Sequence, residues 1–213
     1  MSSRSIERLR PADVPAAAEM LTRAFSADPF FTFMDPDPES RERNVRWYLG
    51  ATAKACIALG GAYVTSGATA GVALWIPRGR ELDAEIEREA GLTERAQVFG
   101  ADIEARYAAL GRAFGEAHQQ IAPEPHHYLT ILGVDPDHQG QGIGGALLRP
   151  FLEDADRDGA ICYVETTRSR NVPFYERHGF VVADARNVEG VPFWTFRREP
   201  PSPMISADSN VDE

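Results

Sequence analysis

The residues best suited to chemistry form a glycine-rich run in the second half of the chain. Four glycines stand there within six positions: Gly140, Gly142, Gly144 and Gly145. The apolar, β-rich segment 128–134 predicts a buried strand before them, and apolar residues at helical spacing from Ile143 predict a helix after them. Glycines let a ligand approach the main chain, and the first N–H groups of a helix have no partner within it. The pattern therefore predicts an anion site for a phosphate or diphosphate.

Two other phosphate-binding loops are also rich in glycine. A Walker loop ends in Gly-Lys-Ser/Thr, whereas Gly144, Gly145 and Ala146 stand here. The spacing of Gly140, Gly142 and Gly145 fits the G-x-G-x-x-G string of dinucleotide-binding folds. That string opens the first strand–helix–strand unit of its fold, but here it follows long helical and β segments, which disfavours a dinucleotide fold.

The loop and a later segment resemble a known family. Residues 139–144, QGQGIG, match the Q/R-x-x-G-x-G/A acetyl-CoA motif of the GNAT (Gcn5-related) N-acetyltransferases. Residues 171–180, NVPFYERHGF, are similar to that family's helix with its tyrosine and closing Gly-Phe. Within the superfamily, the two segments most resemble the puromycin N-acetyltransferase group. The motifs cover about 126–183, and the N-terminal half is similar only in layout.

The resemblance implies an α/β fold of mixed α+β character, the GNAT acyl-CoA N-acyltransferase fold, in which helices flank a central mixed β-sheet. Segment 160–165 predicts a second buried strand, parallel to 128–134, and in this family the two strands splay around the pantetheine arm. The charged segment 81–122 predicts two or three helical pieces inserted before the central strand, where they cover the acceptor site or make a dimer. The domain is expected over 1–199, with a disordered tail over 200–213.

Periodicity and turn residues predict the other elements. Asp13 is expected to cap the first helix, and Asp28-Pro29 to end it. The expected elements are an edge strand over 5–10, helices over 14–25 and 39–59, a hairpin of 62–65 and 71–76, and final strands over 180–183 and 192–197.

The resemblance implies acetyl-CoA as co-substrate. The main chain of Leu132 and Val134 would contact the acetyl and pantetheine part, while the glycine loop holds the diphosphate. Asn171 is a helix cap by residue type; its spacing to Tyr175 is shorter than the family's N-x-x-A-x-x-x-Y. The implied cofactor-binding residues are Leu132, Gly133, Val134, Gln139, Gly140, Gln141, Gly142, Ile143, Gly144, Gly145, Asn171 and Tyr175. Three arginines could neutralise the 3′-phosphate: Arg149, Arg168 and Arg170.

Acetyl transfer to an amine requires a polarised carbonyl, a deprotonated amine and a protonated leaving thiolate. Tyr175 is the candidate acid for the thiolate, and a buried structural tyrosine is the alternative. Glu165, at the end of a buried strand, is the candidate base with a raised pKa, and a salt bridge to a nearby arginine is the alternative. His127 is the second candidate base. Cys162 as an acyl-carrying nucleophile is disfavoured, because no histidine stands at motif spacing.

Aromatic residues supply the candidate acceptor pocket. Phe30, Phe31 and Phe33 lie among Asp and Pro residues and are expected in a loop, either as core under that loop or as pocket wall. In GNAT enzymes the region after the first helix forms one wall of the acceptor site, which favours the pocket. Trp75 is a core residue or a pocket wall, and Tyr128 is the remaining pocket candidate.

Composition limits the function classes. The chain has 213 residues, 43% of them hydrophobic, which suits one sizeable core. The net charge of -10, without a basic block, disfavours nucleic acid. No apolar run suits a membrane span or a signal peptide, so a cytoplasmic protein, monomer or homodimer, is expected. Cys56 and Cys162 are expected as buried thiols, and no metal is expected.

The leading hypothesis is an acetyl-CoA-dependent N-acetyltransferase that acts by direct attack in a ternary complex. Its acceptor would be the primary amine of a small molecule, such as an antibiotic or an amino-bearing metabolite. A protein N-terminal or lysine acetyltransferase is the enzymatic alternative. The non-enzymatic alternative is an acyl-CoA sensor that keeps the cofactor cleft but not the catalysis.

Overall fold

A seven-stranded mixed sheet forms the centre of the protein in a computed structural model that describes residues 5–201. Its order is β1-β2-β3-β4-β5-β7-β6, and only β4 and β5 pair in parallel. The strands are β1 (Ile6–Arg8), β2 (Ala62–Thr65), β3 (Gly71–Ile76), β4 (His127–Val134), β5 (Cys162–Thr166), β6 (Val181–Val188) and β7 (Val191–Arg198). The mixed sheet and the parallel central pair confirm the expected fold class.

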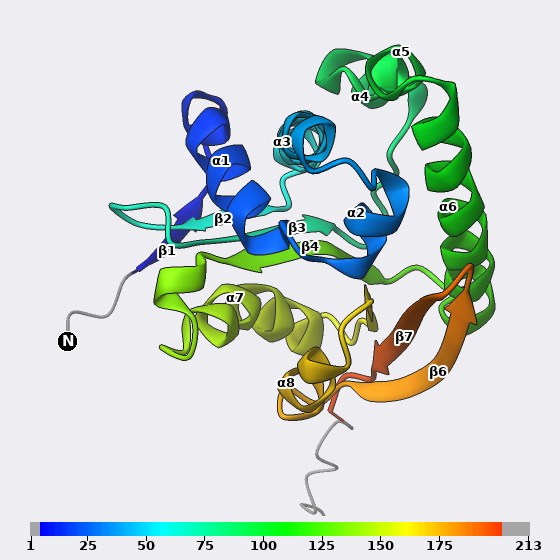
Figure 1. Cartoon of the computed structure of the whole chain (residues 1–213). Coiled ribbons are helices and arrows are strands. Elements are labelled where there is room, and N and C mark those ends of the chain that lie inside the picture. The colour runs from blue at the N-terminus through cyan, green and yellow to red at the C-terminus, as the bar shows by residue number, and fades with distance from the viewer. Residues whose placement is uncertain (1–4, 202–213) are drawn as a thin grey trace, which may run out of the picture.

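Helices cover both faces of this sheet (Figure 1). Helices α1 and α3 pack on one face with one hydrophobic cluster, and α7 and α8 pack on the other face with a second cluster. The helices are α1 (Val14–Phe25), α2 (Pro29–Met34), α3 (Pro38–Ala58), α4 (Ala84–Ala90), α5 (Arg95–Phe99), α6 (Ala101–Ile121), α7 (Ile143–Arg157) and α8 (Val172–Glu176). Because helices cover both faces, a binding site is expected at a point where two strands of the sheet separate.

The two parallel strands separate partway along their length. Residues 127–129 of β4 pair with 162–164 of β5, and the pairing stops there although both strands continue. The C-terminal half of β4 therefore has no strand partner along the edge that faces β5. This arrangement confirms the predicted slot between the two strands.

The segment predicted as helical pieces contains α4, α5 and α6. Gly91 and Gly100 have φ values of 88° and 76°, which end helices because such values disfavour residues with a Cβ. The long helix α6 runs along the edge formed by β6 and β7 and also contacts α2 (Figure 1). It thus covers one side of the region after α1, and its predicted role over the acceptor site stays a prediction.

Three local expectations were wrong. The aromatic residues after Asp28 form helix α2 and not a loop, because Asp28 caps Phe30 N at 3.0 Å and Pro29 suits a first helical position. Asp13 makes no capping hydrogen bond and instead pairs with Arg10 at 2.7 Å. The last two strands, which pair as one hairpin with its turn at Glu189, are longer than expected.

Two expectations concern the ends and the surroundings of the chain. Most of the tail predicted from residue 200 onward, 202–213, lies outside the described residues. Between residues 5 and 201, none of the helices combines the length and the apolar character needed to cross a membrane.

Candidate active site

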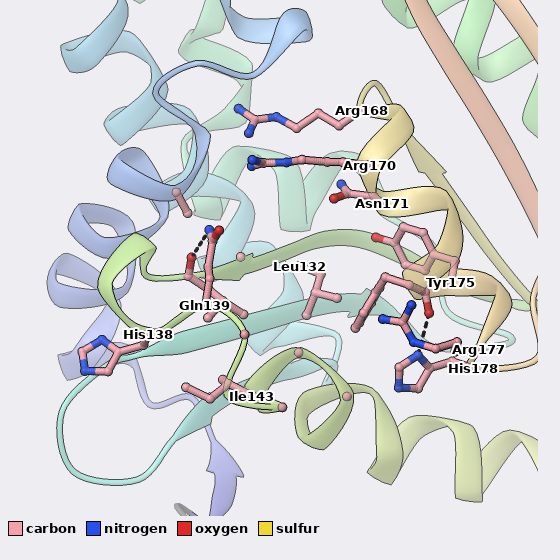
Figure 2. A pocket seen from close by; sticks show the side chains of 18 of the residues that line it. Leu132, His138, Gln139, Ile143, Arg168, Arg170, Asn171, Tyr175, Arg177 and His178 are labelled. Carbon is pink, nitrogen blue, oxygen red and sulfur yellow. Dashed lines mark hydrogen bonds between the residues drawn. The ribbon is translucent and has the colours of Figure 1, made fainter.

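A cavity of about 600 Å³ lies between the end of β4, the glycine loop and helix α8. Eleven of the twelve predicted cofactor residues line it: Leu132, Gly133, Val134, Gln139, Gly140, Gly142, Ile143, Gly144, Gly145, Asn171 and Tyr175. Gln141 does not, because its side chain is exposed to solvent outside the cavity. Figure 2 shows Gln139, whose amide donates to Val134 O at 3.1 Å, on the side of the cavity opposite Tyr175.

The glycine loop leaves unpartnered donors at the start of α7. The first hydrogen bond of the helix runs from Ala146 N to Gly142 O at 3.1 Å, so the N–H groups of Ile143, Gly144 and Gly145 have no partner within the helix. Gly142 has a φ of 78°, which turns the chain into the helix at little conformational cost. Three amide donors and the positive end of a 15-residue helix suit a diphosphate.

Phe174 of α8 and His178, just after this helix, lie close to the start of α7. A Cβ on Gly145 would lie 2.8 Å from His178 Nε2, and one on Gly144 would lie 3.1 Å from the ring of Phe174. His178 Nδ1 donates to Phe174 O at 2.7 Å, which turns Nε2 toward α7 (Figure 2). The two glycines therefore serve helix packing as well as access to the main chain.

Several residues of this cavity were not predicted from the sequence. They are His138, Phe174, Arg177 and His178, together with Ala24, Phe25 and Asp28 from the N-terminal half. The segment 171–180 contains three of them, although the family resemblance implied roles there only for Asn171 and Tyr175. Of the arginines, Arg168 and Arg170 line the cavity, whereas Arg149 lies on the exposed face of α7 beside Glu153, at 4.0 Å.

Asp28 connects helix α2 to the loop after β5. Its carboxylate accepts hydrogen bonds from Phe30 N at 3.0 Å, Thr167 Oγ1 at 2.8 Å and Arg168 Nε at 3.0 Å. Asp28 is 6% exposed, and the Arg168 side chain is 15% exposed. Arg168, a nearby arginine that could have formed a salt bridge with Glu165, is therefore paired with Asp28 instead.

Replacing Asp28 with asparagine is expected to lower the free energy of unfolding by about 3 kcal/mol, because the largely buried guanidinium of Arg168 loses its carboxylate. Asparagine still caps a helix, so Asp83→Asn is a matched control: Asp83 caps α4 through Ile86 N at 2.9 Å, and its change is expected within about 0.5 kcal/mol. Urea denaturation measures both variants. Equally small losses would contradict the role of the ion pair.

A second cavity of about 140 Å³ adjoins the first. Five residues line both: Phe25, Asp28, Leu132, Asn171 and Tyr175. Phe30, Phe31 and Tyr128 line the second cavity, as predicted. The prediction was wrong for two other pocket residues. Trp75 is fully buried in the core, where it stacks on Phe151 at 4.5 Å, and Phe33 lies about 200° around α2 from Phe31.

Glu165 carries the buried negative charge of the second cavity. Its two oxygens accept hydrogen bonds from Tyr128 Oη at 2.7 Å and from Tyr163 Oη at 2.8 Å. Burial raises the pKa of the carboxyl group to about 7, although both tyrosine hydroxyls act in the opposite direction. Near neutral pH such a carboxylate can accept a proton, and its partners are tyrosines rather than arginines.

Tyr175 stands where the two cavities meet. Figure 2 shows its hydroxyl directed into the cavity between Asn171 and Leu132. Burial, followed by the charge of Asp28, raises the pKa of this hydroxyl, so the group stays protonated at neutral pH. Asn171 faces the same space, and its amide donates to Thr166 Oγ1 at 2.9 Å instead of capping α8.

His127 and Cys162 do not belong to the site. His127 is 7% exposed and lies outside both cavities, with Nδ1 accepting from Arg78 N at 3.1 Å, and burial lowers its pKa. The second candidate base was therefore wrong. Cys56 and Cys162 are buried free thiols, as predicted, and burial raises the pKa of each to about 12. Within residues 5–201, no three His, Cys, Asp or Glu side chains are grouped to hold a metal ion.

Known proteins share this architecture. Residues 94–182 match the model of the GNAT acetyltransferase domain. An uncharacterized N-acetyltransferase of Schizosaccharomyces pombe is 34% identical over 77 residues, which are 34% of this chain and 31% of that protein. A mycothiol acetyltransferase of Propionibacterium freudenreichii is 39% identical over 61 residues, 27% of this chain and 20% of that protein. The chain thus spans a third or less of these two curated relatives.

A solved structure from Corynebacterium glutamicum matches the whole fold. It is described as a histone acetyltransferase and related acetyltransferase, and it aligns with a TM-score of 0.70 and 24% identity over 96% of this chain and 100% of that one. At this identity the likeness concerns the fold. None of these similarities points to the puromycin N-acetyltransferase group, which stays a prediction.

Proposed function

The chain belongs to the GNAT superfamily of N-acetyltransferases, and on that premise we propose that it transfers an acetyl group from acetyl-CoA to the primary amine of a small molecule. The observation that carries the proposal is the meeting of two cavities at Tyr175. One offers free main-chain donors, and the other holds a buried carboxylate with a pKa of about 7. The small volume of the second cavity, about 140 Å³, favours a small acceptor over a protein segment.

The donors of the first cavity support its proposed role as the coenzyme A site. The amides of Ile143, Gly144 and Gly145 would hold the diphosphate, and Arg168 or Arg170 would face the remaining negative charge. The free edge of β4 beyond Leu129 would accept the pantetheine arm, because its main-chain groups are not paired with β5. Acetyl-CoA, when bound, supplies an acetyl thioester that an amine can attack.

The residues around the junction would move the protons of the reaction. Glu165 takes one proton from the ammonium group, so that the free amine attacks and a carbon–nitrogen bond forms as the carbon–sulfur bond breaks. Tyr175 donates its hydroxyl proton to the departing sulfur. The second proton lost by the nitrogen restores the tyrosine, and Glu165 releases the first proton to solvent. One ammonium ion and one thioester thus give one amide, one thiol and one proton.

Replacing Tyr175 with phenylalanine is expected to lower kcat about 100-fold, because the departing sulfur loses its proton donor. The Kd for acetyl-CoA should change less than about threefold, since the donors of the glycine loop remain. Thiol release and calorimetry measure the two quantities. An unchanged kcat would remove Tyr175 from the reaction.

The proposal is tested by incubating the protein with acetyl-CoA and a panel of primary amines, and by following free thiol and the N-acetylated product. Amine-dependent thiol release with a matching amount of acetylated small molecule supports the proposal. Acetylation of peptides alone would favour the protein acetyltransferase. Binding of acetyl-CoA without amine-dependent release would favour the acyl-CoA sensor.

A further inference from the structure

Aromatic side chains are the largest group among the residues that line the second cavity. Five of its rings are Phe30, Phe31, Tyr48, Phe114 and Tyr128, which come from three helices and one strand. Phe30 makes an edge contact with Phe31 at 5.2 Å and a tilted contact with Phe114 at 5.6 Å. Rings arranged in this way attract a further aromatic ring through their edges and faces.

Most polar side chains that line this cavity already have a hydrogen-bond partner within the protein. Thr130 donates to Leu74 O at 3.0 Å, and Thr167 donates to Asp28 at 2.8 Å. The hydroxyls of Tyr48 and Tyr107 lie 3.3 Å apart, and that of Tyr128 binds the carboxylate of Glu165. A ligand rich in hydroxyl groups, such as an amino sugar, would leave its own groups unpaired there, which weakens binding.

The charges of the cavity also restrict the ligand. The described residues that line it include two carboxylates, Asp28 and Glu165, and no lysine or arginine. Asp28 is neutralised by Arg168, so Glu165 alone remains to face one ammonium group. An acceptor that carries a carboxylate or a phosphate would find no cation, and the second ammonium of a diamine would find no partner.

The volume sets the size of the ligand. An apolar protein cavity of about 150 Å³ holds one benzene molecule, and this cavity measures about 140 Å³. We propose that the acceptor is a primary monoamine with a single aromatic ring on a short chain, the ring seated among Phe30, Tyr48 and Phe114 and the nitrogen at the junction beside Glu165. This inference rests on the proposed function and narrows its substrate class.

The helical insertion would then determine specificity through Phe114. This ring comes from α6, lines the cavity and contacts Phe193 at 4.4 Å. A smaller residue at this position would lengthen the cavity, whereas a larger one would fill it. Phe33, on α2 but outside the cavity, provides a matched control.

The test compares kcat/KM for four amines with acetyl-CoA: 2-phenylethylamine, 2-(1-naphthyl)ethylamine, 1,4-diaminobutane and glucosamine. The value for 2-phenylethylamine is expected to exceed those for the diamine and the amino sugar at least about 100-fold. Each unpaired hydroxyl group of the amino sugar weakens binding about tenfold, and the unpaired ammonium group of the diamine, which is charged, weakens it about 100-fold. In Phe114→Ala, the ratio of kcat/KM for the naphthyl amine to kcat/KM for the phenyl amine should rise at least about tenfold. In Phe33→Ala, that ratio should stay within about twofold.

The outcomes separate this inference from the function on which it rests. Amine-dependent thiol release in which glucosamine or the diamine equals the aryl amine would leave the acetyltransferase in place and overturn the aryl-amine acceptor. A naphthyl-to-phenyl ratio that responds equally to Phe33→Ala and Phe114→Ala would also overturn it. Thiol release with none of the four amines, although calorimetry shows bound acetyl-CoA, would overturn the aryl-amine acceptor, and its absence with the whole panel of primary amines would overturn the acetyltransferase as well.

Discussion

Replacing Gly142 with valine is expected to weaken acetyl-CoA binding more than about 100-fold. The φ of 78° at this position strongly disfavours a β-branched residue, so the turn must change its shape. That change would move the amides of Ile143, Gly144 and Gly145 away from the diphosphate. A hydrogen bond to a charged group contributes about 1.5–3 kcal/mol, so the loss of two explains the expected factor. Calorimetry with acetyl-CoA measures it.

Gly79 provides the matched control for this variant. It has a φ of 73° and is exposed, and no atom lies within 4 Å of an added Cβ. It follows the C-terminal end of β3, whereas the N-terminal end of that strand is the one near the glycine loop. Gly79→Val should therefore lose similar stability while keeping the Kd for acetyl-CoA within about twofold. A Gly142→Val protein that binds acetyl-CoA as tightly as Gly79→Val would contradict the assignment of the loop.

Replacing Glu165 with glutamine is expected to lower kcat/KM about 100- to 1,000-fold, the usual contribution of a general base. Glutamine has nearly the same size and can still bond with Tyr128 and Tyr163, so the cavity keeps its shape. The affinity for acetyl-CoA should therefore change less than about threefold. Steady-state kinetics and calorimetry separate the two effects, and equal activity of both proteins would exclude Glu165 as the base.

The pH dependence of kcat/KM provides a second test of Glu165 as the base. A base must be deprotonated, and the pKa of Glu165 is about 7, so kcat/KM should fall as the pH falls through 7 and should lose this limb in Glu165→Gln. The Tyr163 hydroxyl lowers the pKa of Glu165, so Tyr163→Phe should move the limb to higher pH. Tyr63, which packs against Phe151 on the other face of the sheet, is the control: Tyr63→Phe should leave the limb in place.

The cofactor side of the site could be predicted from the sequence because it depends on local features. The glycines of 140–145 and the strand and helix around them lie within about thirty residues, and the main chain does most of the binding. The pKa of Glu165 could also be anticipated from its position at the end of a buried strand. Its contact with Tyr128 could not be predicted, since Tyr128 lies on another strand. Tyr163 precedes Glu165 by two residues on the same strand.

The acceptor side depends on contacts between distant segments. Asp28 binds Arg168, which is 140 positions later in the chain, and no periodic pattern connects the two. Helix α2 was mistaken for a loop because the six residues of 29–34 are too few for a helical period to be visible. His127 and Trp75 were wrongly predicted because their residue types are common in functional sites. In the structure, their positions on the strands direct both side chains into the core.

The central claim is that the amides at the start of α7 hold the diphosphate of coenzyme A. Backbone amide NMR spectra, recorded with coenzyme A and with pantetheine, test it most directly because pantetheine lacks the diphosphate. Saturating coenzyme A is predicted to shift the amide signals of Ile143, Gly144 and Gly145 strongly, and pantetheine to leave these three nearly unchanged. Unshifted signals of these residues at saturating coenzyme A would contradict the account.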